Sequence, residues 1–387
     1  MNSKIKATLR KFLSVVLAAL TVFGCAGAAF AAGSDASGTV NGVDWVYTSA
    51  DKTLVLSGSG TLGEDVADFG LFGGSWVAEH VKIGADVNIT TGRVFENFDF
   101  VDEYEVDANN KYLCNPDGVL MDKDKTVLIK YPAGSKEFSF YTVPDTVKTI
   151  SYRAFEFSSA LKTIFLNDGL ETIENFAFDN CGNLLYITIP GTVTSMGKGV
   201  LAQCNLLNKV TIEEGVTAIP EDAFDRCRSL ETVNLPDSLT TIGDIAFFGC
   251  TKLKTLKLPK NLQTFTDSPG RNFGGLNIAL TVDPENQYFS TDDLGVLYNK
   301  DKTLLYYCPN LPYTFDYTVR CDLNKYAFKG CENLRNVDVA YNLRAIPTYA
   351  FNGCKNLNTV TLPGDALKIA VAAILFPKLS VFFDKKQ

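Results

Sequence analysis

The apolar positions of this chain recur with a period of 23 residues. Seven units keep the same phase, and each opens with an Ala-Phe pair or with Val-Leu in the same place: Ala154-Phe155, Ala177-Phe178, Val200-Leu201, Ala223-Phe224, Ala246-Phe247, Ala327-Phe328 and Ala350-Phe351. Within one unit the repeated apolar positions are Phe224, Cys227, Leu230, Val233, Leu235, Leu239 and Ile242. A period of this length, kept over several units, indicates a solenoid in which each unit packs against the next.

The spacing inside one unit predicts short parallel strands. Val233 and Leu235 lie two residues apart and share one face of a strand, so the residues beside them point to the other face. Pro236 ends the strand, because its nitrogen has no hydrogen to donate to a neighbouring strand. The remaining apolar positions supply a second strip and a turn or short helix beneath the strands. One unit cannot enclose these side chains alone, whereas stacked units form continuous apolar columns.

These motifs resemble a known family. The spacing Leu230-x-x-Val233-x-Leu235 matches the core of leucine-rich repeats, and the fuller pattern Ala-Phe-x-x-Cys-x-x-Leu-x-Thr-Val-x-Leu-Pro resembles the BspA-like bacterial surface proteins. The chain departs from the usual leucine-rich repeat at Pro236 and Pro259, where Asn or Cys is expected. The resemblance covers roughly residues 38–363 and predicts a β-rich leucine-rich-repeat solenoid of 23-residue units.

A second, longer repeat interrupts the solenoid at two places, near residues 106–150 and 282–326. Residues 106–112 recur as residues 282–288, and residues 118–126 recur as residues 295–303. In each copy an Asp-Lys pair lies between two apolar runs, which is typical of a hairpin turn. We therefore predict two β-hairpins inserted into the stack, a feature that the resemblance also implies.

The two ends of the chain fit caps on the solenoid. Residues 32–80 are predicted to form a small antiparallel N-terminal β cap, because Val43, Trp45 and Tyr47 alternate with polar residues. The solenoid is expected to span residues 81–365, with residues 81–105 as a degraded first repeat. Residues 366–387 are apolar enough to form a C-terminal cap that covers the last unit.

Residues 1–31 have the pattern of a secretory signal peptide. A basic start is followed by an apolar run over residues 12–23, and Ala29-Phe30-Ala31 is a small-residue cleavage site. An alternative is lipidation at Cys25, since residues 22–25 resemble a lipoprotein motif. Bulky Phe23, where that motif carries a small residue, favours ordinary cleavage. We expect a secreted protein, extracellular or attached to the cell surface.

The net negative charge of the chain argues against some classes of binding partner. The formal net charge is −8 and becomes −12 without residues 1–31, so we expect repulsion from phosphate backbones and no binding of nucleic acid. After the signal peptide, the longest apolar run is residues 369–376, too short to cross a membrane, so no transmembrane span is expected in the mature chain.

Cysteine accounts for ten residues, and six of them share one repeat position, which indicates a structural ladder of buried thiols: Cys181, Cys204, Cys227, Cys250, Cys331 and Cys354. Cys114, Cys308 and Cys321 lie in the insertions and are the candidates for disulfides. No C-x-x-C motif is present and the single histidine, His80, lies far from any cysteine cluster in sequence. We therefore predict neither a metal site nor a cofactor.

The sequence offers little to support catalysis. A Ser-His-Asp or Cys-His arrangement would have to use His80, and nothing around His80 marks a nucleophile. The acidic pairs Asp292-Asp293 and Glu213-Glu214 are interpreted as solvated surface, and Asp122-x-Asp124 as a turn, because the other ligands of a calcium loop are missing. An enzyme is therefore the least favoured class of function.

The outward strand positions remain as the candidate binding surface. They form two rows across the predicted sheet, from which we select Phe165, Tyr186, Thr188, Lys209, Thr211, Thr232, Asn234, Thr255 and Lys257. Threonine is also a good solvent-facing strand residue, so its presence alone does not indicate a ligand. Phe165 and Tyr186 are the aromatic exceptions and are predicted to be contact anchors.

The family resemblance implies adhesion to a protein or glycan on host matrix or on other cells. A second hypothesis is a structural spacer, or a component of the cell-surface layer, without a specific ligand. Binding that depends on the outward strand residues would distinguish the first hypothesis from the second.

Overall fold

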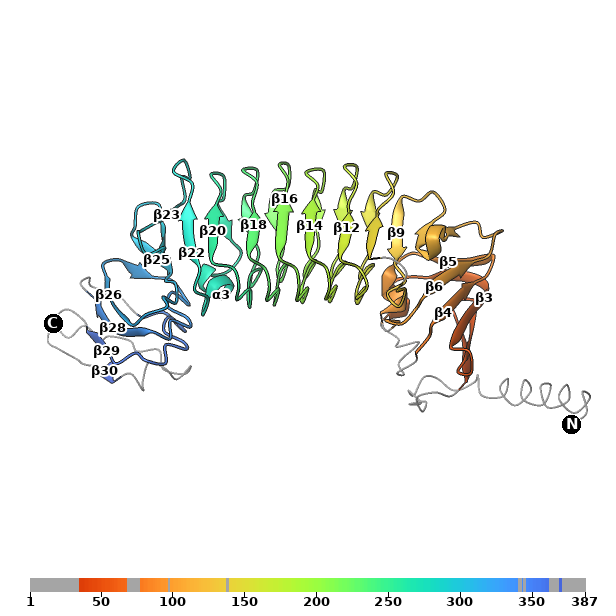
Figure 1. Cartoon of the computed structure of the whole chain (residues 1–387), viewed down its shortest axis with the longest axis horizontal. Helices are drawn as coiled ribbons and strands as arrows, with labels where there is room; N and C mark the ends of the chain where they lie inside the picture. Colours follow the sequence, from red (N-terminus) through yellow and green to blue (C-terminus); the bar gives the residue numbers. More distant parts are fainter. Residues whose placement is uncertain are drawn as a thin grey trace, which may run out of the picture.

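The computed structural model describes residues 35–67, 77–96, 98–136, 139–339, 343, 346–361 and 369–370. The predicted signal peptide with Cys25, and nearly all of the predicted C-terminal cap, lie outside the described residues. Figure 1 shows parallel strands that stand side by side along the long axis of the molecule, with differently directed strands at each end.

The N-terminal part is one sheet that passes directly into the solenoid. Its first three strands, β1 (Ala36–Val40), β2 (Val43–Thr48) and β3 (Thr53–Leu62), are antiparallel, whereas β4 (His80–Ile83) and β6 (Glu103–Val106) continue the same sheet in parallel. β5 (Asp86–Ile89) pairs with the second half of β3, and α2 (Glu64–Ala67) and the 3-10 helix η1 (Gly92–Phe95) lie in the connections. The alternating inward residues of β2 and β3 are buried, because every second side chain of a strand points to the same face.

The central part carries two columns of short parallel strands. The first column contains β10 (Phe140–Thr142), β12 (Thr163–Phe165), β14 (Tyr186–Ile189), β16 (Lys209–Ile212) and β18 (Thr232–Asn234), followed by the pair β20 (Thr255–Leu258) and β22 (Ala279–Val282). The second contains β11 (Thr149–Ile150), β13 (Thr172–Ile173), β15 (Ser195–Met196), β17 (Ala218–Ile219), β19 (Thr241–Ile242) and β21 (Thr264–Phe265). Tyr186 pairs with Lys209 and Lys209 with Thr232, so the register advances by one 23-residue unit per strand. The predicted β-rich solenoid is confirmed.

The Ala-Phe segments form turns, not helices, and each turn contains two residues in the left-handed region. In one unit these are Asp222 (φ 57°) and Arg226 (φ 56°), with Phe224 between them. This geometry directs the amides of alternate residues along the solenoid axis, and the amide of Phe224 donates to the carbonyl of Ala246 in the next turn at 2.8 Å. The turns therefore form a third hydrogen-bonded column, beneath which the phenylalanine rings stack, for example Phe155 on Phe178 with centroids 5.2 Å apart.

The six ladder cysteines lie buried in one column behind these turns. The Cys227 thiol donates to the carbonyl of Leu201 at 3.1 Å, and the Cys204 thiol donates to that of Phe178 at the same distance. All nine cysteines in the described part of the chain are free, including the disulfide candidates Cys114, Cys308 and Cys321. Cysteine suits the position because it is small, apolar and still a weak donor for a backbone carbonyl of the preceding unit.

Each predicted hairpin is present and is also part of the stack. In the first, β7 (Leu113–Cys114), β8 (Leu120–Asp122) and β9 (Val127–Lys130) are antiparallel, with the 3-10 helix η2 (Pro116–Gly118) before β8. In the second, the strands are β23 (Phe289–Thr291), β24 (Leu297–Asn299) and β25 (Leu304–Tyr307), after α3 (Pro269–Phe273). β9 pairs in parallel with β11, and β25 with β27 (Asp322–Leu323), so the last strand of each hairpin restarts the solenoid.

Both faces of each hairpin are buried, and this divides the molecule into three apolar cores. Leu120 packs into the N-terminal core and its neighbour Met121 into the central one. In the second hairpin Leu297 packs into the central core, whereas Val296 packs into the C-terminal one. The C-terminal core is covered by β26 (Phe315–Val319), β28 (Leu334–Val339) and β29 (Thr359–Thr361), which are parallel, and β30 (Ile369–Ala370), which pairs antiparallel with β29.

Candidate binding surface on the sheet face

The first column of strands, β10, β12, β14, β16, β18, β20 and β22, has an outward side that we name the sheet face. It carries every residue that the sequence selected for binding. Phe165 and Tyr186 are each 49% exposed. Tyr186 is paired with Thr163, so Phe165 lies diagonally from it on the neighbouring strand, within the reach of two aromatic side chains. Among the other selected residues, Thr211 is half-buried. The rest are exposed: Thr188, Lys209, Thr232, Asn234, Thr255 and Lys257.

Thr163, which belongs to the same row as Tyr186, does not share this exposure. It is only 8% exposed. Its paired neighbours are Phe140 on one side and Tyr186 on the other, and directly opposite side chains in a sheet lie close enough for such rings to shield a hydroxyl. The row is therefore apolar around β12 and becomes polar from Lys209 onward.

Phe140 is an exposed aromatic residue of this face that the sequence reasoning missed. It is 57% exposed at the start of β10 and extends the aromatic group on this face to three adjacent strands. Phe140 stands 23 residues before Thr163, so the repeat period already contained the signal. The assignment of residues 106–150 to an insertion hid it, because β10 lies inside that segment yet keeps the solenoid phase.

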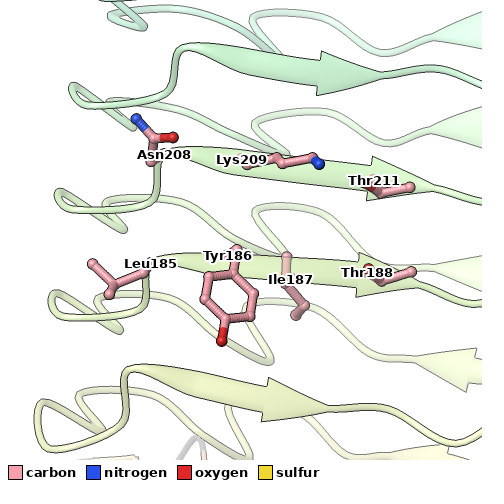
Figure 2. Close-up of a pocket in the computed structure, with 7 residues that line it drawn as sticks. All are labelled: Leu185, Tyr186, Ile187, Thr188, Asn208, Lys209 and Thr211. Carbon is pink, nitrogen blue, oxygen red and sulfur yellow. The ribbon is translucent and has the colours of Figure 1, made fainter.

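An open hollow of about 550 Å³ lies between β14 and β16 (Figure 2). Its lining residues come from the two strands and the turns before them: Leu185, Tyr186, Ile187, Thr188, Asn208, Lys209 and Thr211. Figure 2 shows the Tyr186 ring leaning away from β16, while the Lys209 side chain extends along β16 toward Thr211. The hollow thus has an apolar, aromatic wall and a wall with amide, ammonium and hydroxyl groups.

Some polar side chains of the sheet face form ion pairs or hydrogen bonds within the protein, and others do not. The Lys257 ammonium contacts the Asp283 carboxylate at 2.8 Å, and the hydrogen bond with Asp283 raises the pKa of Lys257. The Asn234 side-chain amide donates to the Thr211 hydroxyl at 3.3 Å. Lys209, in contrast, has no carboxylate within ion-pair distance among the described residues. The Lys209 ammonium is therefore not neutralised by a carboxylate of the described chain.

The histidine and carboxylate groups considered for catalysis contact neighbouring groups of the fold. His80 lies in β4, and its Nδ1 is 4.0 Å from a carboxylate oxygen of Glu103. Asp292 accepts from the amides of Leu294 and Val296 within a turn.

Glu214 and Asp122 also accept hydrogen bonds from backbone amides. Glu214, interpreted from sequence as solvated surface, is exposed and also accepts from the amides of Asp237 and Ser238 in the next turn. Asp122 accepts from the amides of Thr126 and Val127, which closes the predicted hairpin turn. These carboxylates hold backbone amides and are not aimed at a common point.

Two kinds of feature are absent from the described residues. No group of three or more His, Cys, Asp or Glu side chains is placed to hold a metal ion. No helix in the described ranges is both long and apolar enough to cross a bilayer.

Among the solved structures that are similar to this chain, the first described below shows the same fold. A leucine-rich cell surface protein from Faecalibacterium prausnitzii is 20% identical, with a TM-score of 0.50, over 85% of this chain and 83% of that one. A leucine-rich repeat protein from Eubacterium ventriosum is 20% identical, with a TM-score of 0.41, over 69% and 100% of the two chains. The pneumococcal vaccine antigen PcpA is 21% identical, with a TM-score of 0.44, over 86% and 70%.

No curated protein sequence matches the chain at a significant level. A family profile does match. The profile described as "BspA type Leucine rich repeat region" matches six copies over residues 133–254, 217–272 and 303–376, which together make up more than half of the chain. The match confirms the resemblance seen in the repeats, and the chain therefore belongs to the family of BspA-type leucine-rich-repeat proteins.

Proposed function

We propose that this protein binds another macromolecule through the sheet face and acts as a secreted or surface-associated adhesion protein. The observation that carries the proposal is the cluster of Phe140, Phe165 and Tyr186, exposed on three adjacent strands beside an open hollow. Exposed aromatic side chains at the centre of a surface are the residue types that dominate interface energies.

The shape of the surface favours a macromolecule over a small ligand. Small-molecule sites enclose most of their ligand in a concave apolar pocket. The hollow between β14 and β16 is open, and the aromatic cluster beside it spans further strands. A partner that fills the hollow would also cover neighbouring strands, as an extended protein or glycan surface does.

The proposed location rests on the sequence. Residues 1–31 have the pattern of a signal peptide, and cleavage after Ala31 would place the chain outside the cytoplasm. Lipidation at Cys25 is the alternative route to the cell surface. The F. prausnitzii protein of the same fold is described as a cell surface protein, which agrees with this proposal.

The role is proposed to be recognition without catalysis. The family is a repeat scaffold, and the carboxylates named above bind backbone amides in their own or neighbouring turns. The sheet face carries hydroxyl, amide, ammonium and aromatic groups, which suit binding.

The test is a pull-down with the purified protein against host matrix proteins and bacterial cell surfaces, identified by mass spectrometry and followed by saturation binding. The variant Phe165→Ala/Tyr186→Ala should weaken binding by at least about tenfold, because truncating an anchor costs more than about 1 kcal/mol. Tyr112→Ala/Tyr288→Ala is the matched control, since these tyrosines are 45% and 47% exposed but lie in the hairpin segments.

Two results would contradict the proposal. Equal loss of binding in both double variants would show that exposed aromatic area, and not the sheet face, is responsible. Capture of nothing above background would support a structural spacer.

A further inference from the structure

The charges around the sheet face are sorted to opposite edges. The segments in which β12, β14, β16, β18 and β20 begin contain one acidic residue, Glu231, and five basic residues. The basic residues are Lys162, Lys209, Arg228, Lys252 and Lys254. We name these five basic residues the basic edge. Where the same strands end, Asp168, Glu213, Glu214 and Asp237 stand against the single cation Lys260. The sheet face is therefore polarised across its width.

The basic edge is contiguous with the hollow. The amide of Leu185 donates to the carbonyl of Lys162 at 3.0 Å, and the amide of Asn208 donates to that of Leu185 at 2.8 Å. The turns that carry these residues thus stack directly on one another. Lys209 belongs to both the basic edge and the hollow wall, so the charged and aromatic parts form one surface.

The lysines of this edge are available, whereas several lysines elsewhere are neutralised. Lys148, Lys198 and Lys260 each contact a carboxylate on a neighbouring turn at 2.8 to 3.3 Å. Among the described residues no carboxylate lies within 4.0 Å of the Lys162, Lys209 or Lys254 ammonium, and all three residues are exposed. In a chain of net charge −8, an unpaired basic strip of this kind has a local potential opposite to that of the whole molecule.

Apolar side chains lie along the same edge. Leu185 is 39% exposed and Leu206 is 47% exposed, and they lie in the segments before β14 and β16 respectively. Exposed aliphatic side chains are covered best by the apolar side chains of another protein. A polyanion without apolar groups would leave both leucines in water.

We infer that the sheet face docks an acidic protein segment, whose carboxylates face Lys162, Lys209 and Lys254 while its apolar side chains cover Leu185, Leu206 and Tyr186. The inference rests on the proposed function of the sheet face and specifies the chemistry of its partner. Complementary charge speeds encounter and fixes the orientation, and the apolar contacts supply the buried area.

The test selects a phage-displayed library of short random peptides against the full chain and measures the binding of the selected peptides, made synthetically. The inference predicts enrichment of peptides that combine Asp or Glu with Leu, Phe or other apolar residues. Association should be about tenfold slower for Lys162→Gln/Lys209→Gln/Lys254→Gln at low salt, and the difference should shrink at high salt. Lys148→Gln/Lys198→Gln/Lys260→Gln removes the same charge outside the basic edge and should bind like the parent chain.

Circular dichroism and thermal melting verify that each variant is folded. Enrichment of neutral or basic peptides, or of none above background, overturns the inference. So does tight binding of dextran sulfate that depends on the three lysines but not on Tyr186, because that result identifies an anionic polysaccharide as the partner. If Phe165→Ala/Tyr186→Ala binds the selected peptides normally, the proposed role of the sheet face itself fails. If only the lysine variant binds normally, the acidic partner alone is excluded.

Discussion

At the scale of single residues, the repeat phase predicts which cysteines are buried but not what their thiols do. The shared position of Cys204 and Cys227 in the 23-residue unit was enough to predict a buried column. Their hydrogen bonds to carbonyls of the preceding turn depend on left-handed residues such as Asp222 and Arg226. Residue spacing carries no information on this geometry, because it requires positive φ at residues that rarely adopt it.

The ladder makes a testable prediction about thiol reactivity. Under native conditions an alkylating reagent should modify the half-buried Cys114 but not Cys204, Cys250 or Cys331. Burial raises the pKa of these three thiols well above the usual range, and the thiolate is the reactive form. Their reaction must proceed through local opening, so it should be slower by orders of magnitude. Mass spectrometry of the labelled peptides gives the order, and rapid native labelling of the ladder would contradict the structure.

At the scale of elements, two buried asparagines occupy the same position in the two copies of the longer repeat. Asn286 is fully buried; its side-chain amide donates to the carbonyls of Pro259 and Leu262, and its oxygen accepts from the amides of Tyr288 and Phe289. Asn110 makes the equivalent bonds in the first copy. The recurrence of these segments predicted the hairpins, but not that β9 and β25 restart the solenoid. Val127 pairs with Thr149 and Leu304 with Asp322, so neither pair has the 23-residue separation of the repeat.

Asn286→Ala should therefore destabilise the protein by about 2–4 kcal/mol, because several backbone groups lose their partners in a buried site. Denaturant unfolding measures the change. Asn261→Ala is the control: Asn261 is exposed and makes one hydrogen bond, to the carbonyl of Asp237, so its replacement should cost less than about 1 kcal/mol. Equal losses in the two variants would show that the bridging role of Asn286 is wrong.

At the scale of the whole molecule, the repeat identifies the solenoid, while its division into three cores depends on the hairpin faces. The sheet-face rows follow from the same phase, so Phe165, Tyr186 and Lys209 could be placed from sequence. The hollow could not, because it depends on the direction in which the Tyr186 and Lys209 side chains leave their strands.

The buried and half-buried carboxylates of the Ala-Phe turns predict how stability varies with pH. Burial raises the pKa of Glu156 to about 7, against the attraction of Lys130 and Arg153, and it raises the pKa of Asp179 and Asp225. A carboxyl with a higher pKa in the folded state binds its proton more tightly there than in the unfolded chain. Stability should therefore fall as pH rises from about 4.5 to about 7, by on the order of 1–3 kcal/mol.

Thermal melting between about pH 5.5 and 7.5 measures this dependence. Glu156→Gln cannot ionise and should flatten it. A melting temperature that rises with pH over this range, in the parent chain, would show that these carboxyls are ionised at little cost in the folded protein.

The central claim is that a partner covers the sheet face, and hydroxyl-radical footprinting of the full chain tests it most directly. Oxidation of each exposed aromatic side chain is measured by mass spectrometry with and without the captured partner. The account predicts protection of Phe140, Phe165 and Tyr186, with Tyr112 and Tyr288 unchanged. Protection confined to Tyr112 and Tyr288, or uniform oxidation at all five residues, would contradict it.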